Sequence, residues 1–262
     1  MTTPAPSFQI KVDLTNPGQF FACCGLLDLA SRLTPHAMGW FECNAFFVSQ
    51  SHRLSEMVNA ITGVALQQLD PYDTTASPIQ ICSPFDLRLD WWKTDDRAIS
   101  DLKLWAGRME SFRIARAMQL AMRSPDFDTV ELLNIGRVVY EPDEPDKKVE
   151  PFYFDARRGP NAHSRDVGFA PNDLGLTTIA SPSVEFLCLV GLQRTKPVPV
   201  AKMPRVFDYH VWTKPLPALL IPAAVAGILP DSAANGYRFE SWFRTGQRKH
   251  KAFLSAKPKP QS

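Results

Sequence analysis

Residues 15–33 read TNPGQFFACCGLLDLASRL, and this stretch constrains the fold more than any other. Asn16 can cap a helix, and Pro17 suits the first helical position. Gln19 stands three residues after the cap, where a capping box places it. The pattern therefore predicts a helix that begins at Pro17.

Small side chains interrupt the bulky ones in this helix. Ala22 and Gly25, together with the cysteines between them, form a short face on which another element can pack closely, while phenylalanine and leucine supply core volume. The five cysteines of the chain are Cys23, Cys24, Cys43, Cys82 and Cys188. No two form a CxxC pair and two are adjacent, which disfavours a disulfide framework or a zinc site. We expect buried free thiols.

Helical and strand patterns are mixed along the rest of the chain. Residues 7–14 alternate apolar and polar side chains, as a half-buried strand does. Further strands are expected at 40–49, on both sides of Ser83 and Pro84, and near 205–212 and 237–244, with helices at 51–62, 109–123 and 181–194. With 23 prolines, the chain should also contain long irregular loops. Together these patterns predict an α+β fold with a basic C-terminal segment.

The segment EPDEPDKKVE at 141–150 is the best candidate for a boundary, because it is charged and interrupted by proline. We expect an N-terminal α+β unit at 1–140, a loop or linker at 141–150, and a C-terminal α+β part at 151–255 with a basic end. Residues 256–262 are expected to be a disordered tail.

Charge is distributed unevenly. From residue 196 onward there are 11 Lys/Arg and 3 Asp/Glu, whereas the first 195 residues hold 18 and 24. The N-terminus shows no signal-peptide pattern, and the apolar runs at 20–30 and 216–229 are too short to cross a bilayer. We expect a cytoplasmic protein that binds no membrane.

Signatures of catalysis are largely missing from the sequence. It contains no phosphate-binding loop, dinucleotide fingerprint, HExxH or GxSxG. His163 lies in a polar loop and could act as a general base, although turn-forming residues around it favour a structural role. Asp95, Asp96 and Asp101 could suggest a metal site, but acidic loops near strand ends are usually solvated. We expect no catalytic residue, no metal and no cofactor.

Arginines gather on one side of the helix predicted at 109–123. A rotation of about 100° per residue places Arg113, Arg116 and Arg123 within an arc of about 80°. A row of guanidinium groups suits phosphate binding. The alternative interpretation is a solvated helix face.

Two further basic groups follow. Arg157, Arg158 and Arg165 accompany the aromatics of FYFDARRGPNAHSRD, which either stack bases or form the buried face of a strand; the alternation favours the strand. The C-terminal cluster contains Arg244, Arg248, Lys249 and Lys251, and it suits polyanions unless it only keeps the chain in solution. Three basic groups in one chain favour nucleic-acid binding.

Four stretches together resemble a known family. They are VDLTNPGQFFACCGLLDLASRL, LKLWAGRMESFRIARAM, FYFDARRGPNAHSRDVGFAPNDLG and SPSVEFLCLVGLQR. They are similar to the large-subunit-like component of the Cascade effector complex in type I-G (formerly I-U) CRISPR systems. The likeness extends to about residue 215, and NPGQFFACCGLL is its most specific part.

The resemblance implies a non-catalytic subunit of an RNA-guided complex in antiviral defence. Such a subunit is expected to work with other Cascade subunits, CRISPR RNA, target double-stranded DNA and the helicase-nuclease. In related complexes it reads the protospacer-adjacent motif while base pairing reads most of the sequence. The alternative function is a metal-independent endoribonuclease that processes precursor CRISPR RNA, with His163 as its base.

Overall fold

Five α-helices and several small antiparallel sheets form the described part of the chain, which confirms the α+β class. The computed structural model describes residues 4–93, 100–105, 109–158, 178–230, 235–243 and 251–259. The helices are α1 (Pro17–Leu33), α2 (Leu54–Gly63), α3 (Ser111–Ala121), α4 (Pro182–Arg194) and α5 (Ile221–Val225), with 3-10 turns η1 (Pro125–Phe127), η2 (Leu132–Asn134) and η4 (Ala218–Leu220).

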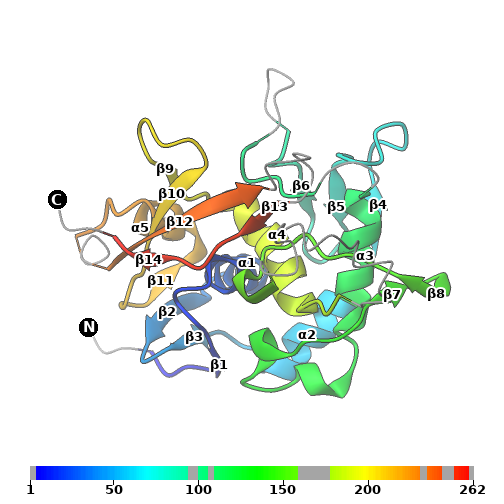
Figure 1. Ribbon diagram of the computed structural model, residues 1–262. Helices are drawn as coiled ribbons and strands as arrows, with labels where there is room; N and C mark the ends of the chain where they lie inside the picture. The colour runs from blue at the N-terminus through cyan, green and yellow to red at the C-terminus, as the bar shows by residue number, and fades with distance from the viewer. Residues whose placement is uncertain are drawn as a thin grey trace.

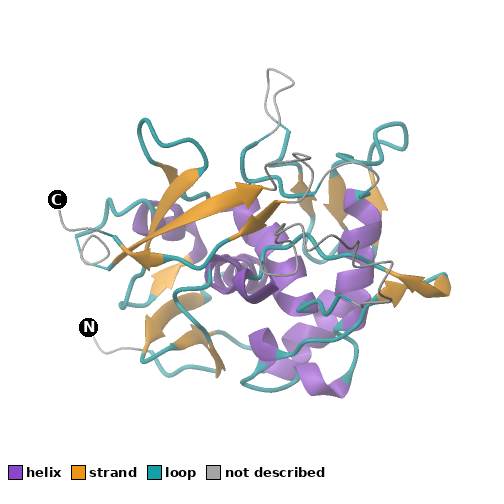
Figure 2. Cartoon of the chain, viewed as in Figure 1, coloured by secondary structure: helices purple, strands orange, loops and turns teal. Residues whose placement is uncertain are grey.

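The strands form three sheets and one separate hairpin (Figures 1 and 2). One sheet has the order β1-β3-β2-β11, from β1 (Phe8–Lys11), β3 (Ala45–Ser49), β2 (Met38–Glu42) and β11 (Leu216–Pro217). The C-terminal sheet has the order β13-β12-β10-β9, from β13 (Lys251–Phe253), β12 (Gly236–Phe243), β10 (Val206–His210) and β9 (Val198–Pro199), and β14 (Lys257–Pro258) also pairs with β12. The third sheet is β4 (Leu66–Gln68), β5 (Ile79–Ile81) and β6 (Leu87–Leu89), and the hairpin is β7 (Tyr140–Glu141) with β8 (Glu144–Lys148).

The helices α1 and α4 cross in the middle of the molecule with their backbones in contact (Figure 1). A Cβ atom added to Gly25 would lie 2.0 Å from the Leu187 carbonyl oxygen, and one added to Gly191 would lie 2.0 Å from that of Phe21. The contact is therefore reciprocal, and only glycine fits on either side. The small face predicted on α1 is confirmed at Gly25.

Aromatic side chains fill the space on both sides of this crossing. Phe20 of α1 lies 4.4 Å from Tyr209 and 5.3 Å from Phe41 between ring centroids. On the other side, Trp105 lies 5.2 Å from Trp92 and 4.8 Å from Phe152. These residues belong to one continuous buried cluster that includes both parts of the chain expected as separate units, so the described residues share a single core.

Two segments differ from the sequence-based expectation. Residues 40–49, expected as one strand, form the β2–β3 hairpin, since Cys43 and Asn44 take φ angles of 47° and 60° and reverse the chain. Residues 141–150, expected as a loop or linker, are largely the β7–β8 hairpin.

The C-terminal tail is ordered further than expected. Residues 257 and 258 pair with Arg238 and Tyr237 of β12, and the Lys259 amide donates to the Gly236 carbonyl at 2.8 Å. Lys259 also lies 3.6 Å from the Asp208 carboxylate. Tail residues up to Lys259 therefore extend the C-terminal sheet.

The cysteines are free where they are described, as expected, but they are not all buried. Burial raises the pKa of the Cys23, Cys24 and Cys188 thiols, so these side chains behave as small apolar groups. Cys82 is half-buried, and Cys43 is exposed at the tip of the β2–β3 hairpin.

No helix in the described ranges has the length and apolar character needed to cross a membrane.

Replacing either glycine at the helix crossing should be severely destabilising. We expect Gly25→Ala or Gly191→Ala to lower the free energy of unfolding by about 3 kcal/mol or more, or to prevent folding, because backbone atoms cannot move aside as a flexible side chain can. Gly63→Ala is the matched control, since its new Cβ meets nothing within 4 Å at the end of α2, and we expect a change within about 1 kcal/mol. Urea denaturation measures all three, and a wild-type midpoint for both core variants would refute the tight crossing.

Candidate nucleic-acid interface

Three of the stretches quoted for the resemblance meet at one buried polar junction, which contains Asn16, Asp155 and Glu185. The Asn16 side-chain amide donates to Asp155 Oδ1 at 2.7 Å, and its oxygen accepts from the Ala156 amide at 3.2 Å. Glu185, in the first turn of α4, accepts the amides of Phe154 at 3.3 Å and Asp155 at 3.2 Å. The junction therefore ties the start of α1 to the start of α4.

Close backbone approach and a second amide side chain complete the junction. A Cβ atom on Gly18 would lie 2.2 Å from the Phe154 carbonyl oxygen. Gln19 accepts the amide of Asp13 at 2.7 Å and donates to the Leu133 carbonyl at 3.2 Å. The predicted capping box is thus only half formed, because Asn16 accepts the Gln19 amide at 3.4 Å while the Gln19 side chain turns to other partners.

The two buried carboxyl groups of the junction differ in charge. Burial, together with the neighbouring Asp155 charge, raises the pKa of Glu185 to about 8, against the lowering effect of the backbone amides. Burial would also raise the pKa of Asp155, but hydrogen bonds and charge from Arg157, with Ser181 and Asn16, hold it below its ordinary value. Near neutral pH the junction therefore holds a neutral Glu185 beside an ionised Asp155.

The predicted arginines of this segment serve the junction. Arg157 donates to Asp155 at 2.8 Å, to the Leu133 carbonyl at 2.7 Å and to Asn134 at 2.8 Å. Arg158 packs against Gly136 and lies 3.9 Å from the Asp155 carboxylate. Their side chains remain 34% and 22% exposed, so only their edges face solvent.

The aromatics before these arginines are not available for base stacking. Phe152, Tyr153 and Phe154 are all buried, and the segment is not the strand that the alternation predicts. Tyr153 takes a φ of 69°, which breaks the extended geometry and lets three successive rings enter the core.

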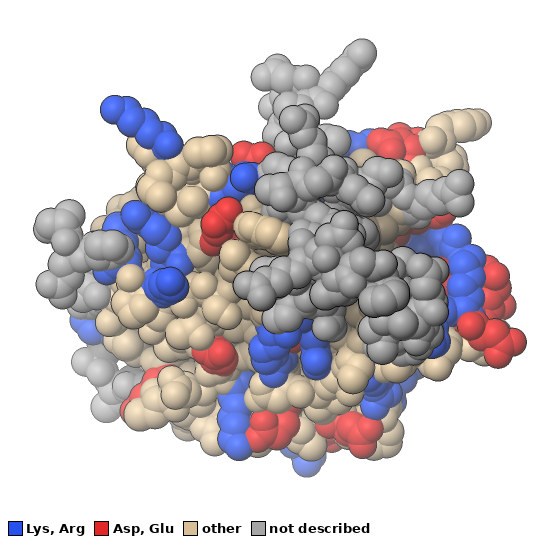
Figure 3. Space-filling view, in the orientation of Figure 1, with Lys and Arg blue, Asp and Glu red and all other residues tan. Residues whose placement is uncertain are grey.

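The arginine row on α3 is present, but acidic side chains neutralise it. Arg113 lies 2.8 Å from Glu141 and 3.4 Å from Glu144, and Arg116 binds Asp143 through both terminal guanidinium nitrogens. Figure 3 shows basic and acidic side chains side by side at the edge where α3 and the β7–β8 hairpin lie. Arg123 follows the end of α3, and its guanidinium caps α2 by donating to the Thr62 carbonyl at 3.1 Å.

Several predicted site residues cannot be placed. Arg165, Arg244, Arg248 and Lys249 lie outside the described residues, as do His163, Asp95 and Asp96. The backbone of Lys251 belongs to β13, but its side chain is not described. Asp101 is exposed, and no group of three or more metal-ligating side chains occurs among the described residues.

A basic groove that sequence reasoning missed lies beside the β9–β10 loop. It has a volume of about 650 Å³. Its charged lining residues are the basic Lys196, Lys202 and Arg205 and the acidic Asp101. Lys202 and Arg205 take left-handed φ angles of 63° and 62°, which normally favour glycine or asparagine. The Val200 amide closes the loop by donating to the Val206 carbonyl at 2.9 Å. The run KPVPVAKMPR, with cations between prolines, was the signal available in the sequence.

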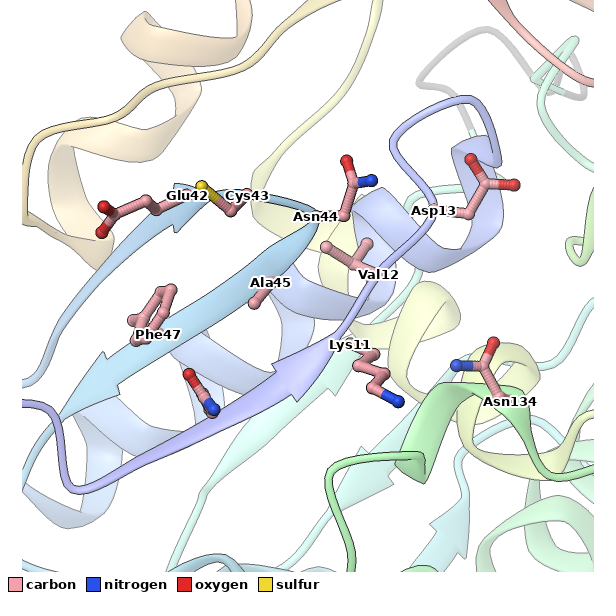
Figure 4. Close-up of a pocket in the computed structure, with 10 residues that line it drawn as sticks. Lys11, Val12, Asp13, Glu42, Cys43, Asn44, Ala45, Phe47 and Asn134 are labelled. Carbon is pink, nitrogen blue, oxygen red and sulfur yellow. The ribbon is translucent and has the colours of Figure 1, made fainter.

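A second hollow of about 580 Å³ lies between β1, the β2–β3 turn and η2 (Figure 4). Lys11 extends towards the side where Asn134 lies, and Glu42 and Asp13 lie at opposite ends of the hollow. Lys11 forms an ion pair with Glu131. One basic and two acidic residues line this hollow, whereas three basic and one acidic residue line the basic groove, so the hollow is the poorer polyanion site.

The junction should make stability depend on pH in a specific direction. Because the folded pKa of Glu185 is raised to about 8, its stabilising contribution is complete below the unfolded pKa of about 4.3 and is lost as pH rises through 8. Between these two pKa values, each rise of one pH unit lowers the free energy of unfolding by up to about 1.4 kcal/mol, because the folded state holds a proton on Glu185 that the unfolded state has lost. Glu185→Gln should remove that slope, measured by denaturation between pH 5 and pH 8. An identical slope in both proteins would contradict the assignment.

Comparisons with known proteins do not assign the chain to a family. No protein-family model, no curated protein and no solved structure matches the chain.

Proposed function

We propose that the chain is a non-catalytic subunit of the RNA-guided Cascade complex of a type I-G (formerly I-U) CRISPR system, where it binds nucleic acid. The observation that supports this most is the positive charge of the C-terminal sheet and its loops. The described residues from 196 onward include eight Lys/Arg and two Asp/Glu. A surface of this kind attracts phosphate backbones without reading their sequence.

Few acidic groups compensate this charge. Asp208 is already held by Arg238 at 2.7 Å and by Lys259 at 3.6 Å, and these contacts lower its pKa although burial opposes them. Lys196 and Lys202, at the basic groove, have no ion-pair partner among the described residues. Two unpaired ammonium groups beside one groove are well placed to replace the counterions of a phosphate backbone.

In this proposal the chain has partners rather than a substrate. It assembles with other Cascade subunits around CRISPR RNA, contacts target double-stranded DNA, and helps to recruit the helicase-nuclease. Base pairing would supply most sequence recognition, and this subunit would add backbone contacts and motif reading. Arg157 and Arg158 would act through the edges that remain exposed, and Arg165 with the 244–251 cluster would add further basic groups for phosphate contacts.

A direct assay distinguishes the proposed function from the competing one, in which the chain is an endoribonuclease that cleaves precursor CRISPR RNA with His163 as its general base. The chain is purified with its genomic neighbours and separately incubated with precursor repeat RNA. The proposed subunit retains guide RNA in the complex and leaves the precursor uncut. Cleavage that is abolished by His163→Ala would establish the endoribonuclease instead.

Removing the two unpaired lysines should weaken nucleic-acid binding. We expect Lys196→Ala with Lys202→Ala to reduce the slope of log affinity against log salt by about 2, because each phosphate contact contributes about 0.9. Lys11→Ala with Lys93→Ala is the matched control of equal charge, since both lysines already pair with carboxylates. Fluorescence anisotropy with labelled duplex DNA and the full chain measures both. Equal losses in the two double variants would count against the groove.

A further inference from the structure

The β7–β8 hairpin is attached to the rest of the protein by its buried base and by ion pairs to α3. It projects from the body beside α3 (Figure 1), and every residue of β8 is exposed. A two-stranded hairpin has little stability of its own in water. Its base is fixed, because Val149 is buried and its amide donates to the Val139 carbonyl at 2.9 Å. The described polar contacts from the hairpin to α3 are ion pairs.

These ion pairs place three hairpin carboxylates on two guanidinium groups. Glu110, which is not part of the hairpin, also lies 3.6 Å from Arg113 Nη1. Glu141 Oε1 lies 2.8 Å from Arg113 Nη2, and Glu144 Oε1 lies 3.4 Å from the same nitrogen. Asp143 Oδ1 lies 3.3 Å from Arg116 Nη2 and also binds through its other oxygen. Arg113 and Arg116 are 35% and 37% exposed, so the carboxylates cover them at the surface.

A phosphate group could take the place of these carboxylates. Guanidinium groups bind carboxylate and phosphate oxygens with the same forked geometry. The carboxylates of Asp143 and Glu144 are 74% and 59% exposed, and exposed ion pairs contribute little net stability. Glu141 is only 13% exposed, so its pair with Arg113 is the main contact that a phosphate has to replace. Lys147 lies 3.1 Å from Glu144 and competes with Arg113 for it, which weakens the cover further.

We propose that the β7–β8 hairpin is a displaceable acidic cover over a phosphate-binding site formed by Arg113 and Arg116. In the free protein Glu141, Asp143 and Glu144 occupy the site. When nucleic acid binds, backbone phosphates replace them and the hairpin moves away from α3. This inference rests on the proposed nucleic-acid function and adds to it a site that opens only in the bound state.

Neutralising the cover should strengthen binding. We expect the full chain with Glu141→Gln, Asp143→Asn and Glu144→Gln to bind labelled single-stranded or duplex DNA about three- to ten-fold more tightly at low salt. Its salt slope should steepen by about 2, because two further phosphates are contacted. The gain over the control described next should disappear when Arg113→Gln and Arg116→Gln are added.

A control of equal charge separates the cover from a general electrostatic effect. Glu42→Gln, Asp128→Asn and Asp146→Asn remove three exposed acids, none of which contacts the α3 arginines among the described contacts. An equal gain in DNA affinity in the control variant would refute the proposal that the hairpin carboxylates cover a phosphate-binding site. If the wild-type chain and both triple variants all fail to bind DNA, both the proposed nucleic-acid function and the acidic cover are refuted. Binding by the cover variant but not by the wild type supports the cover.

Hydrogen exchange provides a second readout that does not depend on variants. Amides of β7 and β8 should lose protection when DNA is added to the wild-type chain, because the ion pairs that hold the hairpin are broken. Increased or unchanged protection there would contradict displacement.

Discussion

The backbones of α1 and α4 touch at Gly25 and Gly191, and the positions of the other elements follow from that contact. Because neither glycine leaves room for a Cβ atom, the crossing brings the two helix starts, with Asn16 and Glu185, to the same side of the core. The segment around Asp155 fills the space between them. Aromatic rings on both flanks then bury the sheets of the N-terminal and C-terminal parts against one pair of helices.

Patterns of local origin were predictable from the sequence. Asn16 and Pro17 mark the start of α1, Ser181 and Pro182 mark that of α4, and the small side chain of Gly25 indicates a close neighbour. What sits opposite Gly25 was not predictable, because Gly191 lies far away in the sequence and inside an ordinary apolar helix. The alternation at 152–156 predicted a strand and was wrong, since a left-handed Tyr153 lets all three rings turn inward.

The candidate site shows that the presence of a charge in the sequence does not make it available. Arg157 is taken up by a buried carboxylate, Arg123 by a helix end and Arg113 by a neighbouring hairpin. The pairings of Arg123 and Arg113 depend on long-range contacts that no local pattern encodes. Arg157 pairs with a carboxylate only two residues away, but the burial of that carboxylate depends on the fold. Conversely, Lys196 and Lys202 looked unremarkable between prolines, and only the folded loop places them at one groove. Electrostatic function is therefore read from unpaired charge rather than from composition.

We expect the α1–α4 crossing to make the described chain one cooperative unit, despite the charged segment in its middle. Native-state hydrogen exchange measured against denaturant tests this directly. Amides in α1 and α4 should exchange together, only through global unfolding, whereas those of the β7–β8 hairpin should exchange by local opening. If α4 opened at a clearly lower free energy while α1 stayed protected, the two parts would fold separately, and the crossing would not join them into one unit.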